Sequence, residues 1–178
     1  RTPQVESLKG FPAGSISPRQ PLQQGSGSVN VIGHGGRILA LPEVGLPWEL
    51  DADLNTIGQY DFDGALASNM TAHPKIDGRT GEMLFFGYDF GNISLRHHVA
   101  DAMGKLVRTV EIEKPIPTMM HDFGVTASRV IFMDLPVAFS LEMAMAGKGL
   151  PFHWRDDMPA RLGILPRDAT SDEVQWIE

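Results

Sequence analysis

Residues 118–136, TMMHDFGVTASRVIFMDLP, are the stretch that decides the fold. They predict two short strands, 119–126 and 129–135, joined by a tight turn at residues 127–128, because β-branched and aromatic residues occupy both arms. A polar pair, His121 and Asp122, interrupts the first arm, and alternation along a strand sends the two side chains to opposite faces. A buried imidazole must be hydrogen-bonded or bound to a metal, so His121 is either a satisfied structural histidine or a ligand.

The same pattern of short predicted strands separated by turn residues continues on both sides of this hairpin. Upstream, VNVIGH and RILALPE flank Gly35 and Gly36, which is a hairpin signal. One helix of about two turns is expected at residues 139–146. Further strands are expected at residues 46–50, 56–60, 71–76, 83–88, 93–100, 105–112, 160–165 and 173–177.

These elements predict an all-β protein, a meander of antiparallel strands with few helices. Lone hairpins cannot bury their apolar faces, so the sheets must pack together as a sandwich, a barrel or the blades of a propeller. The β region is expected at residues 29–178. Residues 1–28 contain four prolines among glycines and serines, and we expect an extended arm there.

Composition excludes several classes of function. The 178 residues carry a net charge of −7 and no run of basic residues, which argues against a nucleic-acid partner. There is no cysteine, so disulfides, thiolate zinc sites and cysteine nucleophiles are excluded. Any metal must be held by histidine and carboxylate, a donor set that suits iron, manganese or zinc. No apolar run approaches the roughly 20 residues that span a bilayer.

Four of the six histidines have ordinary structural interpretations. His34 adjoins a hairpin turn, where an exposed structural role is expected. His97 and His98 are adjacent in a strand, so their side chains face opposite ways and cannot both reach one metal. His153 lies beside Trp154, which favours aromatic packing.

His73 is different because Pro74 follows it directly and removes the next backbone donor. The strand must therefore end, or lie at an edge, at this point. A histidine at the end of a strand and pointing toward a central axis would match the placement of His121, about two hairpins later. Two such histidines on successive four-stranded units would converge at the axis of a propeller.

The segments TAHPKIDGRTGEMLFFGYDF and MMHDFGVTASRVIFMDLP resemble the carotenoid cleavage oxygenase family, which includes the lignostilbene dioxygenases and the retinal pigment epithelial membrane protein. The resemblance extends over residues 29–178 and includes HGGRILALPEVGLPWELD and GILPR. It implies a seven-bladed β-propeller, of which this chain would supply a part. The family holds a non-haem Fe(II) on four histidines at the axis, and dioxygen and substrate use the remaining positions.

By motif match, the resemblance makes His73 the first iron ligand and His121 the second. It also implies that Glu43, in the LALPE segment, hydrogen-bonds His121 as an outer-shell partner. The family's third histidine lies in an FHxxNA(Y/W)E motif that this sequence lacks. The third and fourth ligands would then come from the remainder of the propeller, unless the chain is a relative without catalysis of its own.

Two further departures from the family pattern concern the substrate side of the site. Val29 stands where the family often has a threonine whose methyl lies near the open coordination position. Pro42 stands where stilbene-cleaving members usually carry a lysine that binds a phenol oxygen. The second departure favours a carotenoid or apocarotenoid over a phenolic stilbene.

The resemblance thus implies an Fe(II)-dependent dioxygenase that cleaves a conjugated carbon–carbon double bond of a carotenoid or apocarotenoid to two carbonyl products. Its partners would be dioxygen and a lipophilic polyene, and we expect a cytoplasmic protein with peripheral membrane contact. Met119, Met120, Phe123 and Phe139 are either tunnel residues or plain core. The alternatives are a lignostilbene-cleaving dioxygenase of the same fold, a polyene isomerase and a non-catalytic propeller fragment.

Overall fold

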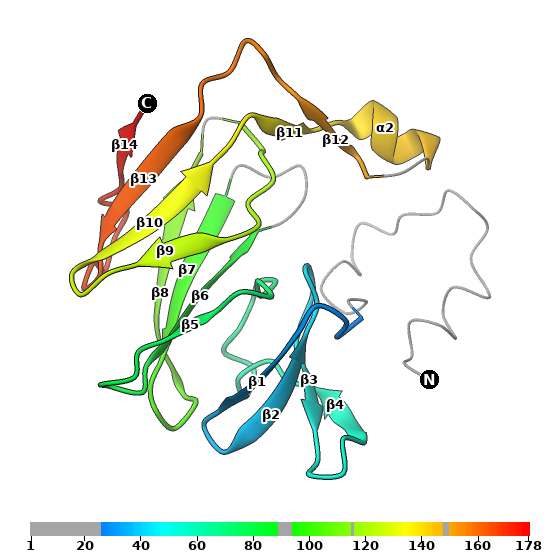
Figure 1. Cartoon of the computed structure of the whole chain (residues 1–178), viewed down its shortest axis with the longest axis vertical. Helices are drawn as coiled ribbons and strands as arrows, with labels where there is room; N and C mark the ends of the chain where they lie inside the picture. Colours follow the sequence, from blue (N-terminus) through cyan, green and yellow to red (C-terminus); the bar gives the residue numbers. More distant parts are fainter. Residues whose placement is uncertain (1–25, 89–93, 115, 148–149) are drawn as a thin grey trace.

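The computed structural model describes residues 26–88, 94–114, 116–147 and 150–178. Within these residues the chain forms three four-stranded antiparallel sheets, one two-stranded sheet and one six-residue helix (Figure 1). The predicted all-β class is therefore confirmed. Most of the expected arm at residues 1–28 lies outside the described residues. No helix in the described part of the chain is long and apolar enough to cross a membrane.

The first sheet follows the order of the sequence. It contains β1 (Asn30–His34), β2 (Arg37–Leu41), β3 (Trp48–Leu50) and β4 (Thr56–Gln59). The two glycines that join β1 to β2 both have positive φ, 56° and 76°, as the tight turns of two-residue hairpins require. The hairpin predicted around these glycines is confirmed, because β1 and β2 pair along their whole lengths.

The second sheet also follows the order of the sequence. It contains β5 (Lys75–Ile76), β6 (Met83–Tyr88), β7 (Ser94–Ala100) and β8 (Leu106–Glu113). The prediction of a strand over residues 71–76 was too long, because pairing with β6 begins only after the proline at position 74.

The third sheet has the order β14-β13-β10-β9. Its strands are β9 (Phe123–Val125), β10 (Arg129–Asp134), β13 (Arg161–Pro166) and β14 (Gln175–Ile177). β9 and β10 form the predicted hairpin across residues 126–128.

An insertion between β10 and β13 holds the two-stranded sheet of β11 (Val137–Phe139) and β12 (Phe152–Trp154), with α2 (Leu141–Ala146) on the same side of the molecule (Figure 1). The Met119 N–H donates to the carbonyl oxygen of Val137, so residues 118–119 pair with the insertion and not with β10. For this reason the first arm of the hairpin begins at residue 123 and not at 119. The helix likewise begins two residues later than predicted, because residue 139 ends β11.

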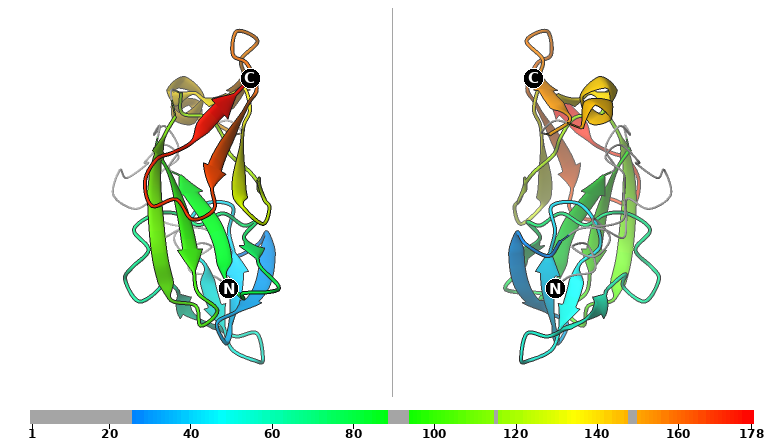
Figure 2. Two further views of the ribbon diagram at one scale, coloured as in Figure 1. Left: turned by 90° about the vertical axis from the view of Figure 1, so that its left-hand side faces the viewer. Right: turned by 90° about the vertical axis from the view of Figure 1, so that its right-hand side faces the viewer.

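The middle sheet, β5–β8, packs on both of its neighbours (Figures 1 and 2). Every residue of β6 is buried, and its side chains alternate between the two faces. Met83 and Phe85 join the apolar cluster shared with the first sheet, whereas Leu84, Phe86 and Tyr88 join the cluster shared with the third. Successive four-stranded sheets packed face to face are the arrangement of propeller blades.

Candidate metal centre

Three polar side chains meet where successive sheets adjoin. His73 precedes β5 by two residues and His121 precedes β9 by two residues, so the histidines occupy equivalent positions in the second and third sheets. Glu43 follows the end of β2 by two residues. A ligand atom from each of the three side chains lies within 4.8 Å of the other two.

Glu43 orients the ring of His121. The Nδ1 of His121 and the Oε1 of Glu43 lie 2.7 Å apart, which is a short hydrogen bond. Because a carboxylate can only accept, Nδ1 carries a proton, and in the neutral ring the lone pair is then on Nε2. The His121 side chain is 58% exposed. Its Nε2 is therefore the nitrogen suited to bind a metal.

The Nε2 of His73 is buried and has no hydrogen-bond partner among the described residues. The Oε2 of Glu43 lies 3.8 Å from it, too far for a hydrogen bond. The rings of His73 and His121 meet edge to face, with centroids 4.4 Å apart. A buried nitrogen without a partner costs free energy, and a metal ion bound there would remove that cost. Two imidazole nitrogens beside a carboxylate fit iron, the metal that the family resemblance implies.

An ion pair that we did not predict joins the two histidine loops. The Nζ of Lys75 lies 2.8 Å from the Oδ1 of Asp122. Desolvation raises the pKa of Asp122, but the hydrogen bonds from Lys75 and from the Phe123 N–H outweigh it and leave the pKa below its usual value. Lys75 belongs to the segment AHPK and Asp122 to MMHDF. The opposite charges in these two motifs could have predicted the ion pair, but we used the motifs only to identify the histidines.

His97 and His98 lie on opposite faces of β7, as predicted. The Nδ1 of His97 bonds to the carbonyl oxygen of Phe85, and burial lowers the pKa of His97 to about 4. His98 lies between the hydroxyls of Ser68 and Thr109, each 2.8 Å from a ring nitrogen, and burial lowers its pKa to about 3. Both rings are neutral core groups, remote in role from the metal centre.

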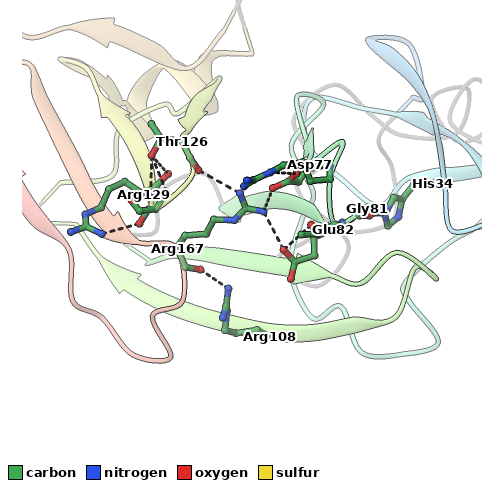
Figure 3. Close-up of polar contacts among 11 residues, drawn as sticks. His34, Asp77, Gly81, Glu82, Arg108, Thr126, Arg129 and Arg167 are labelled. Atoms are coloured by element: carbon green, nitrogen blue, oxygen red, sulfur yellow. Dashed lines mark hydrogen bonds and ion pairs between the residues drawn. The ribbon is translucent and has the colours of Figure 1, made fainter.

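His34 has a structural role, as predicted, but is not exposed, and the prediction of aromatic packing for His153 was wrong. His34 is half-buried, and its Nε2 lies 2.9 Å from the carbonyl oxygen of Gly81, which links β1 to the turn after β5 (Figure 3). His153 is exposed, and Trp154 beside it is 63% exposed, so aromatic packing is absent at these two residues. The reason is that β12 lies in the insertion and not in a core-forming blade.

The candidate tunnel residues divide between core and insertion. Met120 and Phe123 are buried in the apolar cluster between the second and third sheets, so they are core. Phe139 packs against Phe152 within the insertion, with ring centroids 6.0 Å apart.

Arg167, in the GILPR segment, joins the turns at the other end of β5 and β9 (Figure 3). Its Nη2 lies 2.7 Å from the Oδ2 of Asp77 and 3.1 Å from the Oε2 of Glu82, in the turn after β5. Its Nη1 donates to the carbonyl oxygen of Thr126, in the turn after β9. The two strands that follow His73 and His121 are therefore held together at their far ends as well.

Comparison with known proteins identifies the family to which this chain is similar. The model of the family described as retinal pigment epithelial membrane protein matches residues 8–178. The chain is 37% identical over 164 residues to carotenoid 9,10(9',10')-cleavage dioxygenase 1 of Phaseolus vulgaris, covering 88% of this chain and 30% of that protein. It is 34% identical over 156 residues to isoeugenol monooxygenase of Pseudomonas nitroreducens, covering 85% of this chain and 32% of that protein.

Among solved structures, the chain matches a lignostilbene dioxygenase of Pseudomonas brassicacearum at a TM-score of 0.83 and 30% identity, covering 97% of this chain and 38% of that one. It also matches a cobalt-substituted apocarotenoid oxygenase of Synechocystis at a TM-score of 0.80 and 27% identity, covering 99% and 42%. The chain thus spans about a third to two fifths of the length of these relatives.

Proposed function

The chain belongs to the retinal pigment epithelial membrane protein family, and we propose that it forms part of a non-haem Fe(II) dioxygenase. The proposed reaction cleaves a conjugated carbon–carbon double bond of a carotenoid or apocarotenoid. One oxygen atom of dioxygen enters each carbonyl product, so the reaction balances without an external reductant. The observation that carries the proposal is the convergence of His73, His121 and Glu43, two residues before β5, two before β9 and two after β2.

Each of the three residues has a distinct role in this proposal. His73 and His121 hold the iron through Nε2, the nitrogen of His73 that has no partner and the nitrogen of His121 that faces away from Glu43. Glu43 keeps the proton on Nδ1 of His121 and fixes the direction of the ring. Bound Fe(II) supplies the activation of dioxygen. The third and fourth histidines come from the remainder of the propeller.

Metal analysis with matched variants tests the proposal. The protein is loaded anaerobically with Fe(II), desalted and assayed for iron and for cleavage of an apocarotenoid under ¹⁸O₂. We expect about one iron per protein and ¹⁸O in both carbonyl products. His73→Ala and His121→Ala should lose iron and activity, while His153→Ala, at an exposed position in the insertion, should lose neither. Unchanged iron content in the first two variants would contradict the ligand assignment.

Glu43→Gln tests the outer-shell role separately. A glutamine at this position can still contact His121 but no longer carries the charge that favours a protonated Nδ1. We expect iron affinity to fall by about 10-fold to 100-fold, the usual effect of losing such a partner. Affinity equal to that of the unaltered protein, measured by competition with a chelator, would exclude the role.

A stilbene is the second candidate substrate, and the similarity to a lignostilbene dioxygenase supports it. Pro42, directly before Glu43, is buried and offers no amine for a phenol oxygen. This supports a carotenoid or apocarotenoid as the substrate instead. A hydroxylated stilbene and an apocarotenal offered to the same iron-loaded preparation separate the two. The substrate with the higher kcat/KM identifies the class.

Peripheral membrane contact is also part of the proposal, because the substrates are lipophilic. Exposed apolar side chains gather on the insertion, where α2 has no buried residue. Leu141 is 68% exposed, Met145 73% and Trp154 63%. Co-sedimentation with phospholipid vesicles should weaken when Leu141 and Met145 are both replaced by serine. Sedimentation unchanged by that double substitution would exclude the insertion as the contact.

A further inference from the structure

The two metal-site loops share one buried hydroxyl. The Oγ1 of Thr71 accepts a hydrogen bond from the backbone N–H of His73 at 3.2 Å. The same oxygen donates to the backbone carbonyl of His121 at 3.3 Å. A threonine hydroxyl has one proton and two acceptor lone pairs, so it can make both bonds at once. One atom thus links the main chains of two histidines that are far apart in the sequence.

Thr71 is itself held in place. Thr71 is only 3% exposed, and its backbone N–H donates to the carbonyl oxygen of Phe86 in β6 at 2.7 Å. β6 is buried along its whole length between the two apolar clusters. The backbone of Thr71 is therefore attached to a fully buried strand, and its hydroxyl links the backbones of both histidines to that strand.

The Lys75–Asp122 ion pair links the same two loops on the side open to solvent. The Oδ1 of Asp122 accepts both the Lys75 ammonium and the Phe123 N–H, each at 2.8 Å, so the carboxylate is fixed to its own main chain. The side chains of Lys75 and Asp122 are 36% and 38% exposed. An ion pair with this exposure contributes little to the free energy of unfolding. The Thr71 hydroxyl differs from this pair in belonging to a buried residue, where solvent does not screen its hydrogen bonds.

We propose that the Thr71 hydroxyl is a positioning group that sets the separation and relative orientation of His73 and His121. The inference rests on the proposed function, because its purpose is to present two ligand nitrogens to one metal ion. Thr71→Val keeps the shape of the side chain and removes the hydroxyl, so the His73 N–H and the His121 carbonyl both lose their bond to residue 71. Thr71→Ser keeps the hydroxyl and should restore the geometry.

The first measurement needs no metal. The metal-free protein is prepared with ¹³C-labelled histidine. Ring protons of His73 and His121 should give a nuclear Overhauser cross-peak, because the ring centroids lie 4.4 Å apart. We expect the cross-peak in the unaltered protein and in Thr71→Ser, and its loss in Thr71→Val. A Val130→Ala control, which loses stability in the buried core between the second and third sheets, should keep it. An undiminished cross-peak in Thr71→Val overturns the inference.

The second measurement uses Co(II), whose visible spectrum reports the geometry of its ligands. We expect Thr71→Val to shift the absorption bands and to weaken Co(II) binding by about 10-fold to 100-fold, the range for groups that orient ligands. Thr71→Ser and Val130→Ala should retain the spectrum of the unaltered protein, and an unshifted spectrum in Thr71→Val also overturns the inference. If the unaltered protein binds no Co(II), the proposed function fails, and the cross-peak alone then decides the role of Thr71.

Discussion

Acid should destabilise this protein through two buried histidines. The ring of His98 is stacked on Phe85 at a centroid distance of 4.9 Å. Ser68 donates its hydroxyl proton to the carbonyl oxygen of Asn69, so the Nε2–H of His98 donates to Ser68, and Nδ1 accepts from Thr109. A second proton on His98 would therefore oppose the Thr109 hydroxyl proton. Burial resists protonation of the ring most strongly, followed by repulsion from His97 when that ring is also protonated and from the charge of Arg96.

The size of the effect follows from the pKa values. Burial lowers the pKa of His98 from 6.5 to about 3 and that of His97 from 6.5 to about 4. The unfolded state therefore binds more protons than the folded state below pH 6.5. The stability contributed by the neutral rings is complete above pH 6.5 and is lost as the pH falls toward 4. At pH 4.5 the loss is about 2 to 3 kcal/mol for each ring, and roughly 5 kcal/mol for both.

The assay is urea unfolding at pH 7.5, 6.5, 5.5 and 4.5, with His98→Gln and His153→Gln as a matched pair of variants. Glutamine keeps a donor and an acceptor but does not titrate. Between pH 5.5 and 4.5 the free energy of unfolding should fall less steeply in His98→Gln, by about 1.4 kcal/mol per pH unit. His153 is exposed, so its variant should follow the unaltered protein. Equal slopes in all three proteins would refute the assignment of His98 as a buried neutral ring.

Two further predictions concern backbone approach and a buried lysine. Gly87→Ala should destabilise the fold by about 3 kcal/mol or more, because the new Cβ would meet the backbone oxygen of Asn69 at 1.7 Å. Gly58→Ala, with no atom within 4 Å of its Cβ, should cost far less in the same urea assay. Burial lowers the pKa of Lys114 from 10.5 to about 8, so the unfolded state binds more protons between these values and stability should rise with pH. Relative to Lys114→Met, the unaltered protein should gain about 2 kcal/mol between pH 8 and pH 10.

Local signals predicted most of the strands. Two glycines with positive φ make the β1–β2 turn, and continuous runs of apolar residues mark β6 and β10. The errors arose where a distant segment of the chain formed the backbone hydrogen bonds that we had assigned to a neighbouring strand. The predicted strand paired with β10 began at residue 119, but the N–H of that residue donates to β11 instead.

The sequence by itself was enough to identify the family and, through the resemblance to its motifs, the three candidate metal-site residues His73, His121 and Glu43. Their convergence, and the roles of Thr71 and Arg167, were decided by the tertiary structure. Glu43 and His121 are separated by 78 positions, and Thr71 and His121 by 50. Contacts at such separations depend on how whole sheets pack face to face, and side-chain alternation within one strand carries no information about which neighbouring sheet it will meet.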